Sequence, residues 1–266
     1  MADQDCATPI NTNVAHPARI YDYYLGGKDN FPADRAAAQQ ALAATPSVRE
    51  MARENRAFLR RAVRYLVREA GIRQFLDIGT GLPTQGNVHE IAQATAPDAR
   101  VVYVDNDPIV VAHSSALLTA DNTTVVRADL REPDVILGDP EVREVIDFDQ
   151  PVAILLVAIL HFIQDEQDPA GVVARLRHAM SAGSYLVISH GTTDLPNAQP
   201  EVAAKVVRAY QRTTSPVVLR TRAQIERFFD GLELVDPGLV QIQFWRPDGA
   251  SAKVSGGIYG GVGRKP

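Results

Sequence analysis

The strongest constraint on the fold is the regular alternation of short apolar segments with polar, helix-forming segments between residues 71 and 189. The helix-forming segments begin with capping pairs such as Asp107-Pro108 and Asp168-Pro169. Residues 152–158 are uninterruptedly apolar, which is typical of a central parallel strand buried on both faces. This alternation predicts an α/β fold with a parallel sheet and right-handed crossovers. The expected strands are residues 73–78, 100–105, 123–128, 152–158 and 184–189.

The alternation stops after the fifth strand. Two helices are expected at residues 201–213 and 222–229, the second capped by Thr221. Two strand-like stretches follow, at residues 232–244 and 254–262. Only a short turn at residues 246–249 joins them, so we expect these last two strands to be antiparallel.

About seventy residues of mostly helical pattern precede the first strand. Residues 1–15 have no pattern and are expected to be disordered. Helices are expected at residues 17–25, 32–44 and 47–70, and a capping box of Ser47 and Glu50 begins the third. The arginine residues of that helix are interpreted as its solvent-exposed face. We therefore expect a helical extension or lid at residues 1–70 and a Rossmann-like domain at residues 71–266.

Composition excludes several classes of protein. A net charge of -5 argues against a nucleic-acid binder with a broad basic surface. The only cysteine, Cys6, rules out an internal disulfide framework, and the histidines show no metal-ligand spacing, so no metal is expected. The longest apolar run is too short to span a membrane, and no secretory signal is visible, which favours a soluble cytoplasmic protein.

The sequence FLDIGTG at residues 75–81 joins the first strand to a helix and carries the most chemistry. Gly79 and Gly81 would let the backbone turn tightly and approach a ligand, with Thr80 between them. Asp77 would repel a pyrophosphate but suits a cationic amine. The third glycine of the dinucleotide fingerprint is replaced by Thr84. The motif therefore favours a ligand other than a dinucleotide.

Two further acids follow the next two strands. Asp105, at the end of the second strand, can accept hydrogen bonds from both ribose hydroxyls, and Asn106 would lie beside the base. Asp129 could accept from an adenine amino group while the backbone N–H of Leu130 meets a ring nitrogen. Carboxylates on three successive strand ends favour an adenosine with a positive, phosphate-free tail. S-adenosylmethionine is the common cofactor of that description.

With these residues in place, the chain resembles the class I methyltransferases from about Gly71 to its end. That resemblance implies a seven-stranded sheet of order 3-2-1-4-5-7-6 with an antiparallel seventh strand. The stretches ARIYDYYLGGKDNFPADR at residues 18–35 and FLDIGTGLPT at residues 75–84 are similar to one bacterial family. That family was long catalogued as a domain of unknown function and is now described as S-adenosylmethionine-dependent methyltransferases. Neither resemblance specifies the methyl acceptor or the oligomeric state.

The aromatic, glycine-rich segment at residues 21–30 has two interpretations. It can be a helix that packs its tyrosine rings on the core. It can also be a lid over the methionine end of the cofactor, with Lys28 or Asn30 reaching the carboxylate and a ring such as Tyr24 near the sulfonium. We count all three residues among the candidate cofactor-binding residues.

The fourth strand ends in Ala158-Ile159-Leu160-His161-Phe162 rather than in the Asp/Asn-Pro-Pro-Tyr turn of many amino- and DNA-directed methyltransferases. The pattern favours a small-molecule acceptor, with Ala158 near the cofactor. Methyl transfer needs mainly positioning, and a base matters only if the acceptor holds a proton. His161 is the first candidate for that base and His190 the second, although either could simply pack at the end of its strand.

Two alternatives of other classes remain open. A sensor or assembly module could bind S-adenosylmethionine without turnover, because no strong acceptor-activating motif is present. An NAD(P)-dependent oxidoreductase of the related fold is the second alternative, and Asp77 and the missing third glycine weigh against it.

Overall fold

The computed structural model describes residues 11–83, 86–117, 122–195, 200–249 and 256–266. Cys6 and residues 1–10 of the segment expected to be disordered lie outside the described residues, as do the first two residues of the expected last strand. Residues 11–15 are part of the fold. Ala15 is buried, and its carbonyl accepts the backbone N–H of Thr214 over 3.0 Å, which corrects the expectation of disorder for this stretch.

The sheet has the predicted order, β3-β2-β1-β4-β5-β8-β6, with β8 in the place of the antiparallel seventh strand. Its last part differs from the prediction. The stretch at residues 232–244 is not one strand. A turn separates two short strands, both of which pair with β8, and the 3₁₀-helix η4 Ile242–Phe244 follows the second. The strands are β1 Gln74–Ile78, β2 Arg100–Asp105, β3 Thr123–Arg127, β4 Ala153–Val157, β5 Tyr185–Gly191, β6 Glu233–Leu234, β7 Val240–Gln241 and β8 Ile258–Arg264.

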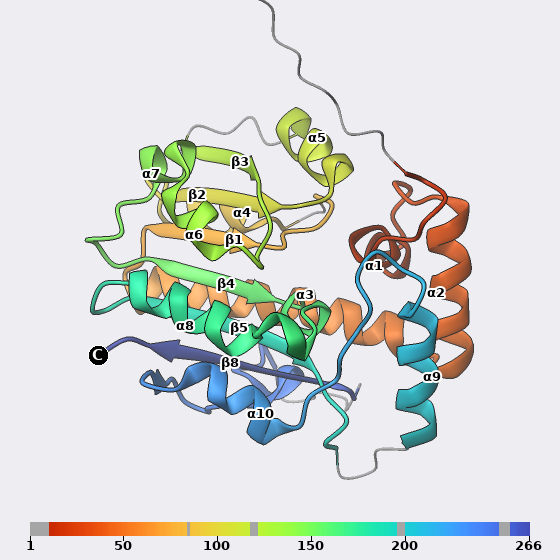
Figure 1. Ribbon diagram of the computed structural model, residues 1–266. Helices are drawn as coiled ribbons and strands as arrows, with labels where there is room; N and C mark the ends of the chain where they lie inside the picture. The colour runs from red at the N-terminus through yellow and green to blue at the C-terminus, as the bar shows by residue number, and fades with distance from the viewer. Residues whose placement is uncertain (1–10, 84–85, 118–121, 196–199, 250–255) are drawn as a thin grey trace, which may run out of the picture.

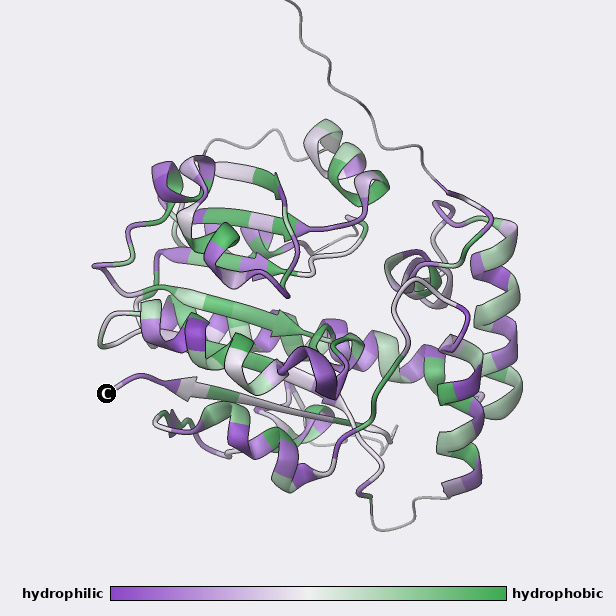
Figure 2. Ribbon diagram, viewed as in Figure 1, coloured by the Kyte–Doolittle hydropathy of each residue, from purple (hydrophilic) through white to green (hydrophobic). Residues whose placement is uncertain are grey.

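Helices cover both faces of the sheet (Figure 1). Because side chains alternate along a strand, Leu76 of β1 packs on one face beneath α6, α7, α8 and α10, whereas Phe75 packs on the other beneath α3 and α4. Figure 2 shows the apolar central strand β4 between these two layers. The described helices are α1 Pro17–Leu25, α2 Pro32–Ala44, α3 Val48–Arg68, α4 Val88–Gln93, α5 Pro108–Leu117, α6 Pro133–Gly138, α7 Pro140–Val145, α8 Pro169–Ala179, α9 Pro200–Tyr210 and α10 Arg222–Glu226. The 3₁₀-helices are η1 Leu160–Phe162, η2 Asp165–Gln167, η3 Arg227–Phe229 and η4 Ile242–Phe244.

A helical cap stands beside the carboxyl edge of the sheet (Figure 1). It consists of α1, α2, α9 and the first half of α3, packed around Ile20, Tyr24 and Ala52. The second half of α3 belongs to the sheet core. One helix therefore joins the cap to the sheet, and α9 brings a late segment of the chain into the cap. The division at residue 70 remains a prediction.

Helix starts are mostly those predicted. The side chain of Asp168 accepts from the backbone N–H of Gly171, and Thr221 and Gln224 form a capping box. The expected capping box of Ser47 and Glu50 is wrong: Ser47 has helical backbone angles and its side chain makes no cap hydrogen bond. The expected helix at residues 222–229 is α10 followed by η3. Within the described residues, no helix is long and apolar enough to cross a bilayer.

Candidate functional site

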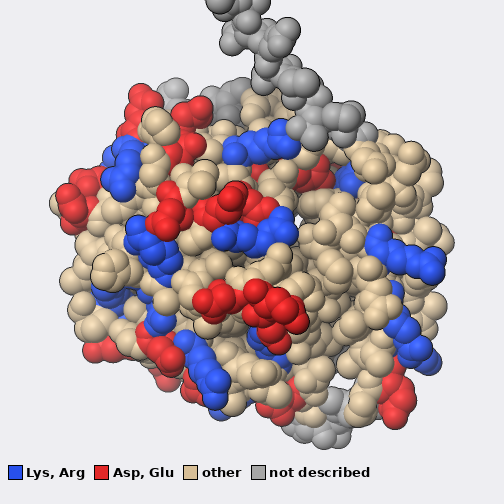
Figure 3. All heavy atoms as spheres, viewed as in Figure 1, with Lys and Arg blue, Asp and Glu red and all other residues tan. Residues whose placement is uncertain are grey.

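A cavity of about 560 Å³ opens between the carboxyl ends of the strands and the helical cap. Figure 3 shows the surface hollowed here, between charged side chains over the sheet edge and a largely uncharged surface over α1. Most of the predicted site residues line this cavity, whereas Lys28, Asn30 and His190 do not. The predicted residues that line it are Tyr24, Asp77, Gly79, Thr80, Gly81, Asp105, Asn106, Asp129, Leu130, Ala158 and His161.

The glycine loop after β1 has the backbone shape that the motif predicts. Gly79 and Gly81 have φ values of 76° and 67°, in the left-handed region that favours glycine. A Cβ on Gly79 would lie 2.5 Å from the side chain of Ile159, so this position also requires close packing. The Gly79 N–H donates to the carbonyl of Val104 over 2.7 Å, which holds the loop against β2.

Two buried carboxylates lie at the base of the cavity. Asp77 and Asp105 are each only 6% exposed, and burial raises the pKa of both to about 6. The positive charge of Arg56 partly opposes this shift at Asp77. At Asp105, hydrogen bonds from the backbone N–H groups of Asp107 and Gly81 partly oppose the rise in pKa. Because no cation neutralises them fully, these carboxylates are suited to a ligand that brings donors or positive charge.

Asp129 is already hydrogen-bonded in the structure. The guanidinium of Arg131 contacts both of its oxygens, and the side-chain amide of Asn106 donates to Oδ2 over 2.9 Å. Burial opposes ionisation of Asp129, but the hydrogen bonds from Arg131 and Asn106 outweigh it and lower its pKa to about 2. An adenine amino group would therefore have to share this carboxylate with Arg131 and Asn106.

Arg56 of α3 is a site residue that the sequence analysis missed. Its side chain lines the cavity, donates to the carbonyl of Gly86 over 2.9 Å and influences the ionisation of Asp77. The helical pattern predicts that the arginine residues of α3 are solvent-exposed. This prediction is also wrong for Arg61, which is buried and donates to the carbonyls of Trp245 and Ile242. No spacing in the sequence separates these two from their exposed neighbours.

Two residues predicted to reach the methionine carboxylate point elsewhere. Lys28 is exposed, and Asn30 is buried with its amide donating to Asp22 Oδ2 over 2.8 Å and to the carbonyl of Gly27 over 3.0 Å. Asn30 therefore stabilises the loop after α1. The lid hypothesis is corrected for these two residues, while Tyr24 of the same segment does line the cavity.

Buried charges attach α1 to the end of β2. His16 Nδ1 lies 3.1 Å from Asp107 Oδ2, and Arg19 Nε lies 3.5 Å from the same oxygen and 3.6 Å from Asp34 Oδ1. Since Asp107 follows Asp105 by two residues, this contact places α1 directly over the base of the cavity.

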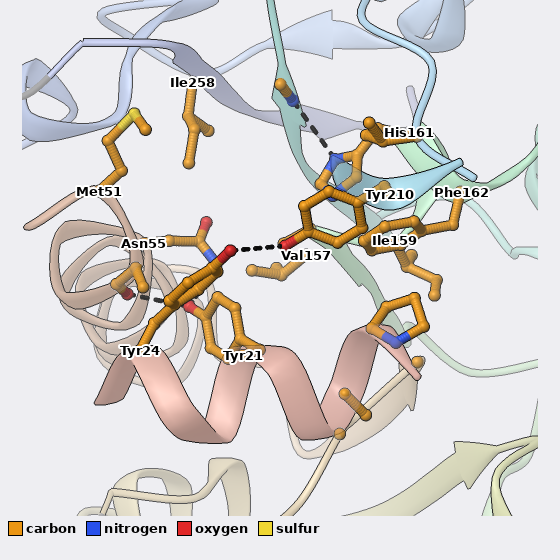
Figure 4. Close-up of a pocket in the computed structure, with 18 of the residues that line it drawn as sticks. Tyr21, Tyr24, Met51, Asn55, Val157, Ile159, His161, Phe162, Tyr210 and Ile258 are labelled. Atoms are coloured by element: carbon orange, nitrogen blue, oxygen red, sulfur yellow. Dashed lines mark hydrogen bonds between the residues drawn. The ribbon is translucent and has the colours of Figure 1, made fainter. Parts of the chain in front are cut away.

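Aromatic and apolar side chains line the end of the cavity next to the helical cap (Figure 4). The hydroxyl of Tyr210 in α9 donates to that of Tyr24 in α1 over 3.2 Å. Asn55 accepts from Ser189 over 2.6 Å and donates to the Tyr21 hydroxyl over 3.1 Å, so its orientation is fixed. Met51, Val157, Phe162 and Ile258 complete this end.

The two candidate bases differ in position. His161 lies in η1, lines the cavity, and accepts the Gly191 N–H at Nδ1 over 3.3 Å. His190 is 0% exposed, and its ring nitrogens contact the Gly191 carbonyl over 2.7 Å and Arg220 over 3.0 Å. Burial lowers the pKa of His190 to about 3. His190 therefore supports the wall of the cavity, and its prediction as a base is corrected.

Among the described residues, no group of three His, Cys, Asp or Glu side chains is arranged to hold a metal ion.

The comparisons with known proteins agree with this geometry. A family model described as S-adenosyl methyltransferase matches residues 3–266. The chain belongs to this S-adenosyl methyltransferase family. No protein with a curated description matches it significantly in sequence.

Solved structures support the same assignment. A DUF574 family protein from Streptomyces avermitilis is 48% identical, with a TM-score of 0.92 over 97% of this chain and 100% of its own. A proposed methyltransferase from Thermobifida fusca is 42% identical, with a TM-score of 0.90 over 99% of each chain. Human N-acetylserotonin methyltransferase, solved with S-adenosylmethionine, shares the fold at 12% identity, with a TM-score of 0.50 over 87% of this chain and 57% of its own.

The protein is thus an S-adenosylmethionine-dependent methyltransferase, and the oxidoreductase and sensor alternatives lose their support. The residues of the site fit this cofactor. Asp77 and Asp105 are buried carboxylates that lack full compensation, and the left-handed glycines between β1 and α4 let the backbone approach a ligand closely.

Proposed function

We propose that the protein transfers the methyl group of S-adenosylmethionine to a small organic molecule bound at the aromatic end of the cavity. The observation that carries this proposal is the division of one continuous cavity into two chemically different ends. Carboxylates of β1 and β2 line one end, whereas Tyr24, Phe162 and Tyr210 line the other. The volume of about 560 Å³ is in the range of small-molecule sites, about 300–1,000 Å³.

We assign the cofactor contacts as follows. Asp105 accepts hydrogen bonds from the ribose, and Asp77 binds the ammonium group of the methionine part, with Gly79, Thr80 and Gly81 alongside. Arg56, rather than Lys28 or Asn30, pairs with the carboxylate of the methionine part. Asn106, Asp129 and Leu130 lie at the adenine, and Ala158 lies beside the glycine loop.

S-adenosylmethionine supplies a methyl group on a positively charged sulfur, already activated for transfer. The chain's own residues contribute binding, alignment and the exclusion of water. Tyr21 and Tyr24 of α1, held over the cavity by the His16–Asp107 contact, separate the reacting atoms from solvent.

Transfer of methyl groups by the purified protein tests this proposal. The protein is incubated with S-adenosylmethionine and with a cell extract divided by ultrafiltration into small molecules and macromolecules. Formation of S-adenosylhomocysteine with the small-molecule fraction supports the proposal. The Asp105→Ala variant, which should lose cofactor binding, is the matched control. Product formation with the macromolecular fraction alone would overturn it.

A further inference from the structure

The aromatic end of the cavity, which we call the acceptor pocket, has a specific electrostatic character. We define it by Tyr21, Tyr24, Asn55, His161, Phe162 and Tyr210. The ionisable residues of the cavity lie elsewhere. Asp22 is bonded to the loop after α1, and His16, whose pKa is lowered by burial, lies against Asp107. The others lie at the cofactor end, namely Arg56, Asp77, Asp105, Asp129 and Arg131. Among the described residues, the acceptor pocket therefore has no charge to balance an ionic acceptor.

The polar groups of the acceptor pocket offer hydrogen-bond donors to a ligand. Tyr24 and Tyr210 have two hydroxyl protons but share one hydrogen bond, so one O–H remains for a ligand. Their pKa values are raised by burial, to about 12 for Tyr24, so both are neutral. The Tyr21 hydroxyl already donates to the carbonyl of Ala52 over 2.9 Å, and both ends of the Asn55 amide are bonded. A ligand therefore meets one free O–H from this tyrosine pair, whose oxygens can also accept a hydrogen bond.

His161 adds a second donor. The Gly191 N–H occupies the lone pair of Nδ1, so the proton of the neutral ring is on Nε2. Nε2 has no hydrogen-bond partner in the part of the chain that the structure describes, and His161 lines the cavity. To act as a base through Nε2, the ring would need its proton on Nδ1, opposite the Gly191 N–H. Two donors would then face each other, which costs the hydrogen bond. Burial, His190 and Arg220 also hold the pKa of His161 well below its usual range.

We propose that His161 is a hydrogen-bond donor rather than a base, and that the acceptor is an uncharged, flat, largely apolar molecule with a hydrogen-bond-accepting group for Nε2–H. This proposal rests on the function proposed above. The nucleophilic atom of such a molecule attacks with a lone pair that is free at neutral pH. That lone pair forms the new bond to the methyl carbon while the carbon–sulfur bond breaks and leaves its electrons on sulfur. The positive charge passes to the acceptor atom, and any proton on that atom is lost to water afterwards.

Three naphthalenes of the same frame test the recognition. They are 2-acetylnaphthalene, which accepts a hydrogen bond, 2-ethylnaphthalene, which does not, and the anion 2-naphthoate. Binding to the protein saturated with S-adenosylhomocysteine is measured by ligand-observed NMR. We expect the anion to bind at least about tenfold more weakly than the two neutral probes. His161→Phe should weaken the binding of 2-acetylnaphthalene by about fivefold and leave the binding of 2-ethylnaphthalene unchanged. His161→Gln, which keeps an N–H, should restore part of the difference.

Calorimetry with S-adenosylhomocysteine separates the two proposals. A protein that does not bind it contradicts the proposed function. A protein that binds it but takes up none of the neutral probes, or takes up 2-naphthoate equally well, contradicts the acceptor class alone. Transfer to 6-acetyl-2-naphthol at pH 6, where this molecule is un-ionised, separates a donor from a base. Transfer that His161→Phe abolishes would make His161 a base and overturn the proposal. Transfer to the un-ionised probe that persists in His161→Phe, reduced no more than the binding of the probe, supports the proposal. Transfer that appears only as the probe ionises also contradicts it, because the acceptor would then be an anion.

Discussion

The carboxylate of Asp105 accepts the backbone N–H of Gly81 over 2.9 Å, so the end of β2 holds the glycine loop that follows β1. Its other oxygen accepts the N–H of Asp107, the residue that anchors α1, over 2.9 Å. One buried side chain therefore links the loop, the ribose position and the helical cap. Each oxygen retains a lone pair for a ligand hydroxyl.

We predict that Asp105→Ala weakens binding of S-adenosylhomocysteine by about ten- to over a hundredfold, because a charge-assisted hydrogen bond contributes roughly 1.5–3 kcal/mol. Isothermal titration calorimetry measures the change. Asp134→Ala on the surface of α6 should leave the affinity unchanged. A loss below twofold in Asp105→Ala would place the ribose elsewhere.

The raised pKa values of Asp77 and Asp105 predict that cofactor binding depends on pH. Both groups titrate near pH 6 in the empty protein, against an ordinary value of 3.8. A raised carboxyl pKa favours folding at low pH, so the stability of the empty protein declines as the pH rises through about 6. The cofactor prefers the ionised acids, so its affinity has the opposite trend.

We therefore expect S-adenosylhomocysteine to bind about tenfold or more weakly at pH 5 than at pH 7.5. Its own groups do not titrate between these values. Thermal unfolding with and without the ligand should show a larger stabilisation at pH 7.5. Asp129, with a pKa of about 2, stays ionised throughout and cannot be the source of the effect. An affinity that is flat from pH 5 to pH 7.5 would show that neither buried acid contacts the ligand.

The sheet and the strand-end acids could be predicted from the sequence because each depends on a local pattern. The apolar segment around β4 and the capping pair Asp168-Pro169 determine their elements within a few residues, and parallel strands bring Asp77 and Asp105 to one edge. The hairpin prediction failed in detail because residues 232–244 look continuously strand-like, although only β6 and β7 pair with β8.

The other errors concern contacts between distant segments. Arg56 resembles every other arginine of α3 in the sequence, and only the packing of α3 across the sheet turns it toward Asp77. His161 follows the apolar strand β4 and His190 lies at the end of β5, but Arg220, which contacts His190, comes thirty residues later. A role that depends on such a partner is visible only in three dimensions.

Arg220 predicts a stability effect that is separate from cofactor binding. It is 4% exposed and donates to the carbonyls of Leu160 and Ile163 on either side of His161, over 3.1 and 2.9 Å, and to His190. Arg220→Met leaves these buried acceptors unpaired and should lower the free energy of unfolding by about 3 kcal/mol. Chemical denaturation measures the loss. Arg227→Met, at an exposed position nearby, is the control and should change the free energy of unfolding by less than about 0.5 kcal/mol. Equal stabilities of the two variants would show that Arg220 does not hold the segment that carries His161.

Arg56 gives the sharpest test of how the amino-acid part of the cofactor is bound. If its guanidinium pairs with the carboxylate of the amino-acid part, Arg56→Gln should weaken the binding of S-adenosylhomocysteine by about ten- to a hundredfold, as expected for loss of a charge-assisted contact. Methylthioadenosine, which has the adenosine and the sulfur but no amino-acid group, should bind the variant and the unchanged protein equally. Arg53→Gln, at an exposed position of the same helix, is the matched control and should change the affinity for neither ligand. Equal losses for both ligands in Arg56→Gln would instead mean that Arg56 acts by holding the segment at Gly86, to whose carbonyl it donates.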